Sequence, residues 1–185
     1  ERQHQVCVED FKMGKYEVTN REFRRFKASH DSNHYKDHDL NGEDQPAVYV
    51  SWEDPMGYAQ WLSEKTGRRY RYANVADQTA KSQWSGWTTH ECRDGYPVTA
   101  PVGRFEPNGF GLHDMLGNVW EWTCSAYDKA YGGNENRCVG ENHAGSVAVR
   151  GGSWGNKPRN VRSAFRNWKT PRYRFNLLGF RLAQD

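Results

Sequence analysis

Long apolar runs are scarce in this chain of 185 residues, and that scarcity excludes several classes of protein. No segment approaches the ~18 consecutive apolar residues of a membrane-spanning helix, so we expect no membrane span. The near-continuous Val, Ile and Leu runs of a buried parallel sheet are also missing. Aromatic residues nevertheless make up 14% of the chain, with eight Trp, ten Tyr and eight Phe, which argues against disorder. We predict a single, loop-rich domain over residues 1–185 with a mainly aromatic core.

Cysteine is also rare, and its spacing disfavours one kind of metal site. The four cysteines, at positions 7, 92, 124 and 138, form no C-x-x-C pair, so a structural zinc site is a poor prediction. The sequence starts at Glu1 without Met or a basic-then-apolar leader, so we infer no compartment from a signal peptide. Cys124 and Cys138 bracket a polar, Gly- and Asn-rich stretch, and a disulfide between them would stabilise the fold by roughly 3 kcal/mol. We favour that disulfide, and an extracytoplasmic, oxidising compartment, over four reduced thiols.

Acidic residues are nearly absent from the last part of the chain. Residues 147–185 carry nine basic side chains against one acidic side chain, a net charge of +8, whereas residues 1–146 carry a net charge of −5. Clustered arginines are typical of proteins that bind phosphates of nucleic acids. Here they alternate with Trp, Tyr and Phe, which equally suits guanidinium groups stacked on rings or paired with the acidic part. We favour the internal pairing and regard nucleic acid as an unlikely partner.

Two helices are predicted in the first third of the chain. Thr19 and Glu22 form a capping box, and apolar residues three apart follow it, which predicts a helix of about three turns. Ser51 is the predicted cap of a second helix, with two acidic residues and Pro55 in its first turn and Gly67 at its end. Short strands are predicted at residues 15–18, 97–105, 118–122, 147–151 and 179–183. Helices first and short strands later indicate an α+β fold.

Seven local motifs occur in order along the chain. They are YEVTN at 16–20, PAVYVSW at 46–52, TAPVG at 99–103, PNGFGLHDM at 107–115, GNVWEW at 117–122, RGGSW at 150–154 and GFRL at 179–182. With these motifs the sequence resembles the formylglycine-generating enzyme (sulfatase-modifying factor) family. The resemblance implies a C-type-lectin-like fold with two helices, short irregular strands and much loop. A helical segment that the family has after residue 71 is missing from this sequence.

The resemblance also implies two structural calcium sites in loops. Calcium prefers carboxylate and carbonyl oxygens, which loops supply readily. The first site would use the side chains of Asn74 and Asp94 with the carbonyls of Val75 and Tyr96. The second would use the side chains of Asp114 and Glu121 with the carbonyls of Gly117 and Val119. The alternative is that the two carboxylates of the second site cap turns or pair with the basic segment.

The same resemblance implies that the family's catalysis is lost. Family members oxidise a substrate cysteine with copper held by two cysteines after the Gly-Gly-Ser motif, because soft Cu(I) prefers sulfur. The matching positions are Asn156 and Val161, so no copper and no formylglycine formation are expected. No P-loop, dinucleotide fingerprint or nucleophile elbow is present. An oxidoreductase with a different metal centre is the alternative, but the histidines at 30, 34 and 38 indicate a solvated loop rather than a ligand set.

The C-terminal segment resembles the variable region of proteins diversified by retroelements, which use this lectin-like fold to bind ligands. The resemblance implies a non-catalytic receptor for a protein or cell-surface ligand. The positions expected to be exposed for binding are Gly155, Asn156, Phe165, Trp168, Tyr173, Phe175, Asn176 and Leu177. Aromatic side chains give a large contact area at small entropic cost, and arginine adds directional hydrogen bonds. The alternative is that these aromatic residues form the core, to which we assign Trp154 and Phe180.

Overall fold

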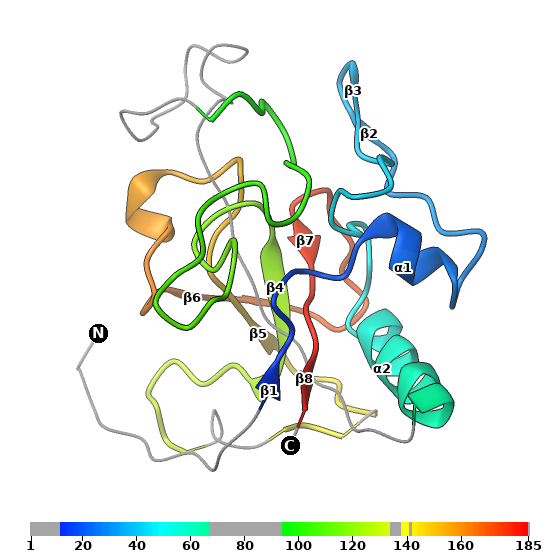
Figure 1. Cartoon of the computed structure of the whole chain (residues 1–185). Coiled ribbons are helices and arrows are strands. Elements are labelled where there is room, and N and C mark those ends of the chain that lie inside the picture. The colour runs from blue at the N-terminus through cyan, green and yellow to red at the C-terminus, as the bar shows by residue number, and fades with distance from the viewer. Residues whose placement is uncertain (1–11, 67–93, 134–137, 141, 185) are drawn as a thin grey trace.

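A computed structural model describes residues 12–66, 94–133, 138–140 and 142–184. Its elements are short and separated by long connections (Figure 1). In chain order they are β1 (Lys12–Met13), α1 (Asn20–Arg24), β2 (His34–Tyr35), β3 (His38–Asp39), α2 (Glu53–Thr66), β4 (Trp120–Ala126), β5 (Val147–Arg150), the 3-10 turn η2 (Pro158–Asn160), β6 (Arg166–Lys169), β7 (Leu178–Gly179) and β8 (Ala183–Gln184). This mixture is the predicted α+β class. None of the described helices is long and apolar enough to cross a membrane.

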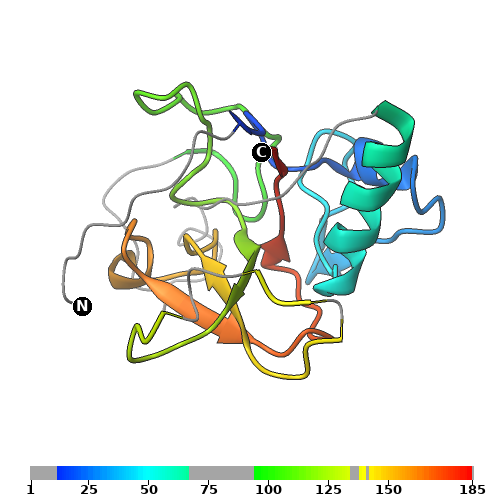
Figure 2. The ribbon, with the colours of Figure 1, turned by 90° about the horizontal axis from the view of Figure 1, so that it is seen from below.

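The central sheet has four strands in the order β6-β5-β4-β7. Strand β5 pairs antiparallel with both β4 and β6, whereas β7 runs parallel to β4. Strands β1 and β8 pair with each other, so the two ends of the described chain lie side by side (Figure 1). Both helices lie on one side of the sheet (Figure 2), which leaves the long connections to build the other surfaces.

The capping box of the first helix is present, but the helix is shorter than predicted. The Thr19 side chain accepts from the Glu22 N–H, and the Glu22 carboxylate accepts from the Thr19 N–H at 2.9 Å. The helix ends after five residues because the chain turns to bury His30 edge-on against Phe23, with ring centroids 4.7 Å apart. His34 and His38 lie in the β2–β3 hairpin rather than a plain loop, and His30 is buried elsewhere, so the three histidines form no common site.

The second helix begins two residues after Ser51, close to the predicted start, and its predicted end at Gly67 lies outside the described residues. Ser51 is bonded to the first turn of this helix. Its N–H and its hydroxyl both donate to Asp54 Oδ2, at 2.8 and 2.9 Å. Asp54 also accepts from Lys27 at 3.0 Å and from Arg174. The start of α2 is therefore bonded both to the segment that follows α1 and to the C-terminal segment.

Three of the five predicted strands are present, and two are not. Residues 118–122 and 147–151 correspond to β4 and β5, and residues 179–183 divide between β7 and β8. Residues 97–105 contain no strand. The N–H groups of Ala100 and Gly103 donate instead to the side chains of Asn118 and Asp114. Residues 15–18 also form no strand, although the Val18 N–H donates to the Phe180 carbonyl.

The core is aromatic, as predicted. Trp52, Trp122, Phe23 and Phe180 are fully buried, and Trp154 is almost so. The indole N–H of Trp52 donates to the Thr123 carbonyl at 3.0 Å, so its polar atom is satisfied inside the core. Aromatic rings with satisfied donors thus replace the aliphatic residues that the composition lacks.

Candidate ligand-binding surface and cation site

The turn after the Gly-Gly-Ser motif holds the two positions at which the family carries thiols. The buried Ser153 hydroxyl donates to the Asn156 amide oxygen at 2.7 Å. Gly152 has a φ of +94°, and a Cβ built on it would lie 2.9 Å from Val161 Cγ2. The valine therefore packs directly on the glycine backbone. An engaged amide and an alkyl group offer no soft donor, so these residues do not fit a Cu(I) centre.

A second group of residues surrounds Glu121 on β4. Its side chain is fully buried, and Oε1 lies 3.4 Å from Nε of the fully buried Arg181. Oε2 of Glu121 has no hydrogen-bond partner among the described residues. Arg181 donates its remaining bonds to the carbonyls of Gly14, Lys15 and His113 at 2.7–2.9 Å. Burial raises the pKa of Glu121 well above its usual value, and Arg181 offsets that only in part.

Asp114 and Glu17 extend this group. Burial raises the pKa of Asp114, although its Oδ2 accepts from the Gly103 N–H at 2.9 Å and its carboxyl bonds to that of Glu17. Glu17, which is 1% exposed, accepts from the Asn118 amide at 2.7 Å. Three carboxyl groups thus lie near one arginine, and burial disfavours the ionised forms of Asp114 and Glu121. We call Glu17, Asp114, Glu121 and Arg181 the carboxylate cluster.

Asp114 and Glu121 make the contacts of the alternative interpretation, because Asp114 accepts from the Gly103 N–H and Glu121 pairs with Arg181 of the basic segment. The second calcium site stays a prediction. Asp114, Gly117 and Glu121 lie on one loop and the start of β4, and the φ values of +57° at Asp114 and +143° at Gly117 mark the sharp turns between them. No three described His, Cys, Asp or Glu side chains are arranged as a metal-binding group, so the carbonyls of Gly117 and Val119 would have to supply much of the coordination. A divalent cation would balance the charge and give Glu121 Oε2 a partner.

The predicted first calcium site can be described only in part. Asn74 and Val75 lie outside the described residues. Asp94 accepts from the Tyr96 N–H at 2.6 Å, which closes a local turn. The sequence prediction missed Glu17 and Arg181, because their partners lie 101 and 60 residues away along the chain. Their only signal was their place within two of the seven motifs.

Three of the aromatic residues predicted to bind ligand are exposed, but they do not form one patch. Trp168, Tyr173 and Phe175 are 49%, 37% and 39% exposed. The rings of Tyr173 and Phe175 lie 5.9 Å apart, and Lys169 Nζ lies 5.2 Å from the Tyr173 ring centroid. Trp168 precedes Lys169 on β6, so its side chain points to the opposite face of the sheet. The Tyr173–Phe175 patch is therefore a separate surface.

The other predicted positions are less accessible, and Asn176 was assigned wrongly. Asn176 is 2% exposed because the chain turns at Phe175, whose carbonyl accepts from the N–H groups of Tyr49 and Leu178. Leu177 packs against two groups of buried core residues, one that includes Trp52 and Phe180 and one that includes Trp154. Phe165 lies against Trp120, with ring centroids 5.9 Å apart, and is half-buried. Gly155 and Asn156 are also half-buried.

A cavity of about 420 Å³ borders the Tyr173–Phe175 patch. It is lined by Glu53, Asn142, His143, Ala144, Thr170, Pro171 and Arg172. The wall at 170–172 belongs to a turn closed by the bond from the Tyr173 N–H to the Thr170 carbonyl at 2.9 Å. Arg174 holds this segment on the body of the molecule through Asp54, the Ser51 hydroxyl and the Tyr49 carbonyl. An exposed aromatic pair beside a polar cavity is an arrangement suited to binding.

The basic segment pairs with the acidic part less completely than predicted. Arg174 and Arg181 form ion pairs with Asp54 and Glu121. Four further basic residues are exposed and form no ion pair with any other described residue: Lys157, Arg159, Arg162 and Arg172. Burial lowers the pKa of Lys169. Much of the positive charge of this segment therefore faces solvent.

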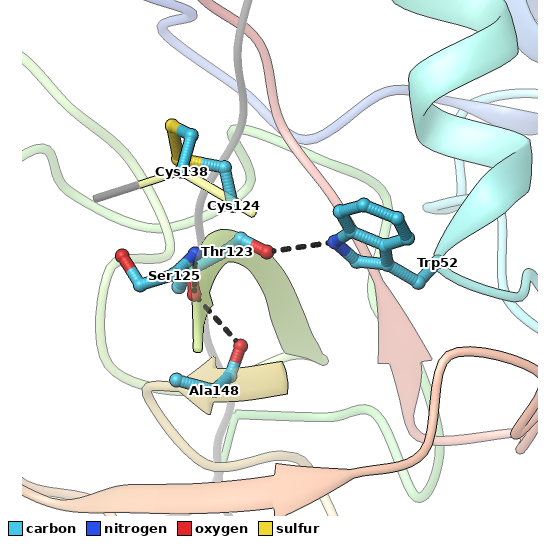
Figure 3. Close-up of a disulfide and its surroundings, with 6 residues drawn as sticks. All are labelled: Trp52, Thr123, Cys124, Ser125, Cys138 and Ala148. Atoms are coloured by element: carbon cyan, nitrogen blue, oxygen red, sulfur yellow. Dashed lines mark hydrogen bonds between the residues drawn. A yellow bond between two sulfur atoms is a disulfide. The ribbon is translucent and has the colours of Figure 1, made fainter. Parts of the chain in front are cut away.

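The predicted disulfide joins Cys124 and Cys138 (Figure 3). The bond links Cys124 on β4 to Cys138 and so closes a loop of the chain between these two residues. Cys7 and Cys92 lie outside the described residues. Beside it, the Thr123 hydroxyl donates to the Ala148 carbonyl at 2.8 Å and ties β4 to β5. Within the closed loop, the Tyr131 ring stacks on the Arg166 guanidinium at 3.5 Å. The loop is thus attached to both β4 and β6.

Comparison with known proteins gives a family match over the whole chain. The model described as "Sulfatase-modifying factor enzyme 1-like domain" matches residues 1–185. The formylglycine-generating enzyme of Streptomyces coelicolor is 32% identical over 174 residues, which cover 80% of this chain and 55% of the relative. The inactive C-alpha-formylglycine-generating enzyme 2 of Mus musculus is 30% identical over 163 residues, with 76% and 49% covered. The chain spans about half the length of the curated relatives it matches.

Solved structures agree with this match. PvdO from Pseudomonas aeruginosa has a TM-score of 0.72 at 30% identity and covers 95% of this chain and 80% of its own. Treponema denticola variable protein 1 has a TM-score of 0.69 at 17% identity, with 94% and 84% covered, and shows the fold alone. The C-type-lectin-like fold predicted from the motifs is confirmed.

Proposed function

Since this chain belongs to the sulfatase-modifying factor family, we propose that it is a non-catalytic member that binds a protein or cell-surface ligand. The observation that carries the proposal is the pair Asn156 and Val161 at the thiol positions, with the amide hydrogen-bonded to Ser153 and the valine packed on Gly152. A matched relative of similar identity is named as an inactive member of the family. Without the two thiols, the function that we propose for the fold is ligand binding.

The proposed binding site is the Tyr173–Phe175 patch with its adjoining cavity. Two contacting rings held by a short turn lose little rotamer freedom when a ligand covers them. The cavity of about 420 Å³ is large enough for one side chain or sugar of the ligand. Arg172 lines the cavity and is one of the exposed basic residues of the C-terminal segment, and its guanidinium would supply directional hydrogen bonds.

A panning experiment tests this site. A displayed library of random 12-residue peptides is selected on the unchanged chain, and the selected clones are measured on two variants. We expect Tyr173→Ala combined with Phe175→Ala to reduce binding ~10-fold or more. Trp168→Ala, an exposed aromatic residue on the other face of β6, is the matched control and should bind normally. Selected clones that bind the double variant as well as the unchanged chain would contradict the proposed site.

The proposed origin of the ligand specificity is diversification by a retroelement. The basic and aromatic segment at 147–185 holds the Tyr173–Phe175 patch, as a variable region would. The coding DNA tests this directly. A nearby template copy that differs from this gene mainly at adenines is expected, and its absence would remove the diversification without affecting ligand binding.

The proposed cofactor is structural calcium, with no copper. The second site would use Asp114 and Glu121 side chains with the carbonyls of Gly117 and Val119, and the first would use Asn74, Val75, Asp94 and Tyr96. The second site is supported by three carboxyl groups close together and by Oε2 of Glu121, which has no hydrogen-bond partner among the described residues. Calcium would neutralise the cluster and fix its loop. An extracytoplasmic location, which the disulfide supports, would supply this ion freely.

The alternative function is an oxidoreductase with another metal centre. It is kept because the chain is about as similar to a relative named as an active enzyme as to one named inactive. Metal analysis and oxygen consumption with cysteine-containing peptides separate the two functions. Stoichiometric copper or iron with turnover would overturn the non-catalytic proposal.

A further inference from the structure

Hydrogen bonds hold the exposed loop at 105–112 in one conformation. All four of its internal hydrogen bonds involve Asn108. Its side-chain oxygen accepts from the N–H groups of Phe110 and Leu112 at 2.9 and 3.2 Å. Its carbonyl accepts from Gly111, and its N–H donates to the Leu112 carbonyl, both at 2.9 Å. A loop held in this way pays little ordering entropy when it binds.

This loop carries an apolar side chain that is exposed to solvent. Phe110 is 90% exposed, more than any other large apolar side chain among the described residues, and Leu116 on the following turn is 50% exposed. A phenylalanine left in water forfeits roughly 2 kcal/mol of burial free energy. Exposed apolar groups on a preorganised loop are typical of an interaction surface.

A cavity lies in the same surface, next to the exposed ring. It has a volume of about 380 Å³. Its apolar wall is formed by Phe105, Pro107, Leu112, Met115 and Leu116, and the rest of its lining is Glu106, Asn108, Asp114, Gly117 and Asn118. A ring that enters it would lie against the apolar wall, beside the loop of the proposed second calcium site. The cavity is larger than a phenylalanine side chain. One surface therefore carries both a projecting ring and a cavity that suits such a ring.

Two exposed charges of opposite sign flank these features. Arg104 and Glu106 lie two residues apart at the start of the loop. Neither forms an ion pair with any other residue in the described part of the chain. A surface that has both members of a charge pair and both members of a ring–cavity pair is complementary to itself, as a two-fold interface requires.

We propose that the 104–116 surface binds a second copy of this chain. In the resulting two-fold dimer, Phe110 of one protomer occupies the cavity of its partner, and Arg104 pairs with the Glu106 of the other protomer. The interface does not include the Tyr173–Phe175 patch, so each dimer carries two copies of the proposed ligand site. Two copies on one particle increase the avidity for a ligand displayed on a surface.

Sedimentation equilibrium of the full chain tests the dimer at protein concentrations up to the order of 100 µM. The expected result is a concentration-dependent dimer whose affinity falls ~10-fold or more in Phe110→Ser. Trp168→Ser removes another exposed ring, 49% exposed against 90% for Phe110, and should leave the dimer unchanged. A monomer at every concentration, or a dimer that Phe110→Ser does not weaken, would overturn the proposal.

Exchange of the two charges tests the two-fold arrangement itself. Arg104→Glu and Glu106→Arg should each weaken the dimer, and the double variant should restore it, because exchanged charges again pair across the axis. A double variant as weak as the single variants would overturn the arrangement. Phe110-dependent flotation of a monomeric chain with phosphatidylglycerol-containing vesicles would also overturn it and assign the loop to a lipid surface. Each variant is first compared with the unchanged chain by near-UV circular dichroism.

Discussion

At the scale of single residues, Asp114 is the most informative side chain of the carboxylate cluster. Its backbone has a φ of +57°, which Asp and Asn adopt more readily than most residues. Burial raises the pKa of its carboxyl, so the ionised form is destabilised when no cation is bound. Asparagine keeps the shape and the tolerance of this backbone while it removes the charge. Asp114→Asn therefore separates the electrostatic role of the residue from its structural role.

We predict opposite responses of the Asp114→Asn variant with and without calcium. In EGTA its unfolding midpoint should be at least as high as that of the unchanged chain, because a disfavoured buried charge is gone. Calcium at about 100 times its Kd should stabilise the unchanged chain by roughly 2.7 kcal/mol and the variant by much less. Thermal unfolding followed by circular dichroism measures both. Asp37→Asn, an exposed carboxylate on the hairpin, is the control. Equal stabilisation of Asp114→Asn by calcium would rule out this ligand.

His30 gives the molecule a dependence on pH. Its ring is 8% exposed, contacts Phe23 and lies 3.0 Å from the Ser32 hydroxyl. Burial, assisted by the charge of Arg24, lowers the pKa of His30 from 6.5 to about 4. The unfolded chain therefore takes up a proton at a pH where the folded chain does not. The stabilising contribution of the neutral ring is complete above pH 6.5 and is lost as the pH falls from 6.5 towards 4.

The predicted loss is roughly 2–3 kcal/mol of unfolding free energy over that pH range. His30→Gln should flatten this part of the pH profile, because glutamine does not titrate. Urea unfolding at a series of pH values measures it. His34→Gln, on the exposed side of the hairpin, should keep the full slope. A slope that survives in His30→Gln would assign the pH dependence to other groups.

At the scale of elements, the sequence predicts what neighbouring residues decide. The capping box of α1 and the start of α2 depend on residues within three positions, and both are present. Residues 97–105 were predicted as a strand because their composition is apolar, yet their N–H groups bond to Asn118 and Asp114. Nothing local in the sequence reports such distant acceptors. The predicted length of α1 was wrong for the same reason, because the contact of His30 with Phe23 ends the helix and the local sequence does not report it.

The bonds that attach the start of α2 to the C-terminal segment can be tested by the single substitution Asp54→Ala. Burial of Asp54 opposes its ionisation, but hydrogen bonds from Lys27, Ser51 and Arg174 outweigh it and lower its pKa. Asp54→Ala should reduce the unfolding free energy by about 2 kcal/mol and remove the ion pair of Arg174, which keeps only its hydrogen bonds to Ser51 and Tyr49. Peptides selected on the Tyr173–Phe175 patch should then bind more weakly, as fluorescence titration would measure. Glu64→Ala, on the exposed part of the same helix, should change neither quantity.

At the scale of the whole molecule, the motifs predicted the fold better than they predicted the surface. The aromatic core follows from the composition, the lectin-like arrangement from the resemblance carried by the motifs, and the disulfide from two cysteines that bracket a polar stretch. The exposure of Tyr173 and Phe175 and the burial of Asn176 depend on a turn fixed by the Tyr49 N–H. The separation of Trp168 from that patch depends on which face of β6 each residue occupies. To predict which of these side chains are exposed, and on which face of β6 they lie, the register of the strand is needed.

The proposed loss of copper binding is likewise a question about the whole scaffold, and restoring the two thiols tests it. If only the two side chains distinguish this chain from its catalytic relatives, Asn156→Cys combined with Val161→Cys should bind one Cu(I) per chain. The unchanged chain should bind none there, because it offers an amide and an alkyl group at these positions. Competition with a chromogenic Cu(I) chelator measures the affinity, and Asn156→Ser with Val161→Ser controls for size. Equal Cu(I) binding by the serine control or by the unchanged chain would show that copper is held elsewhere, and the proposed loss of the centre would then be wrong.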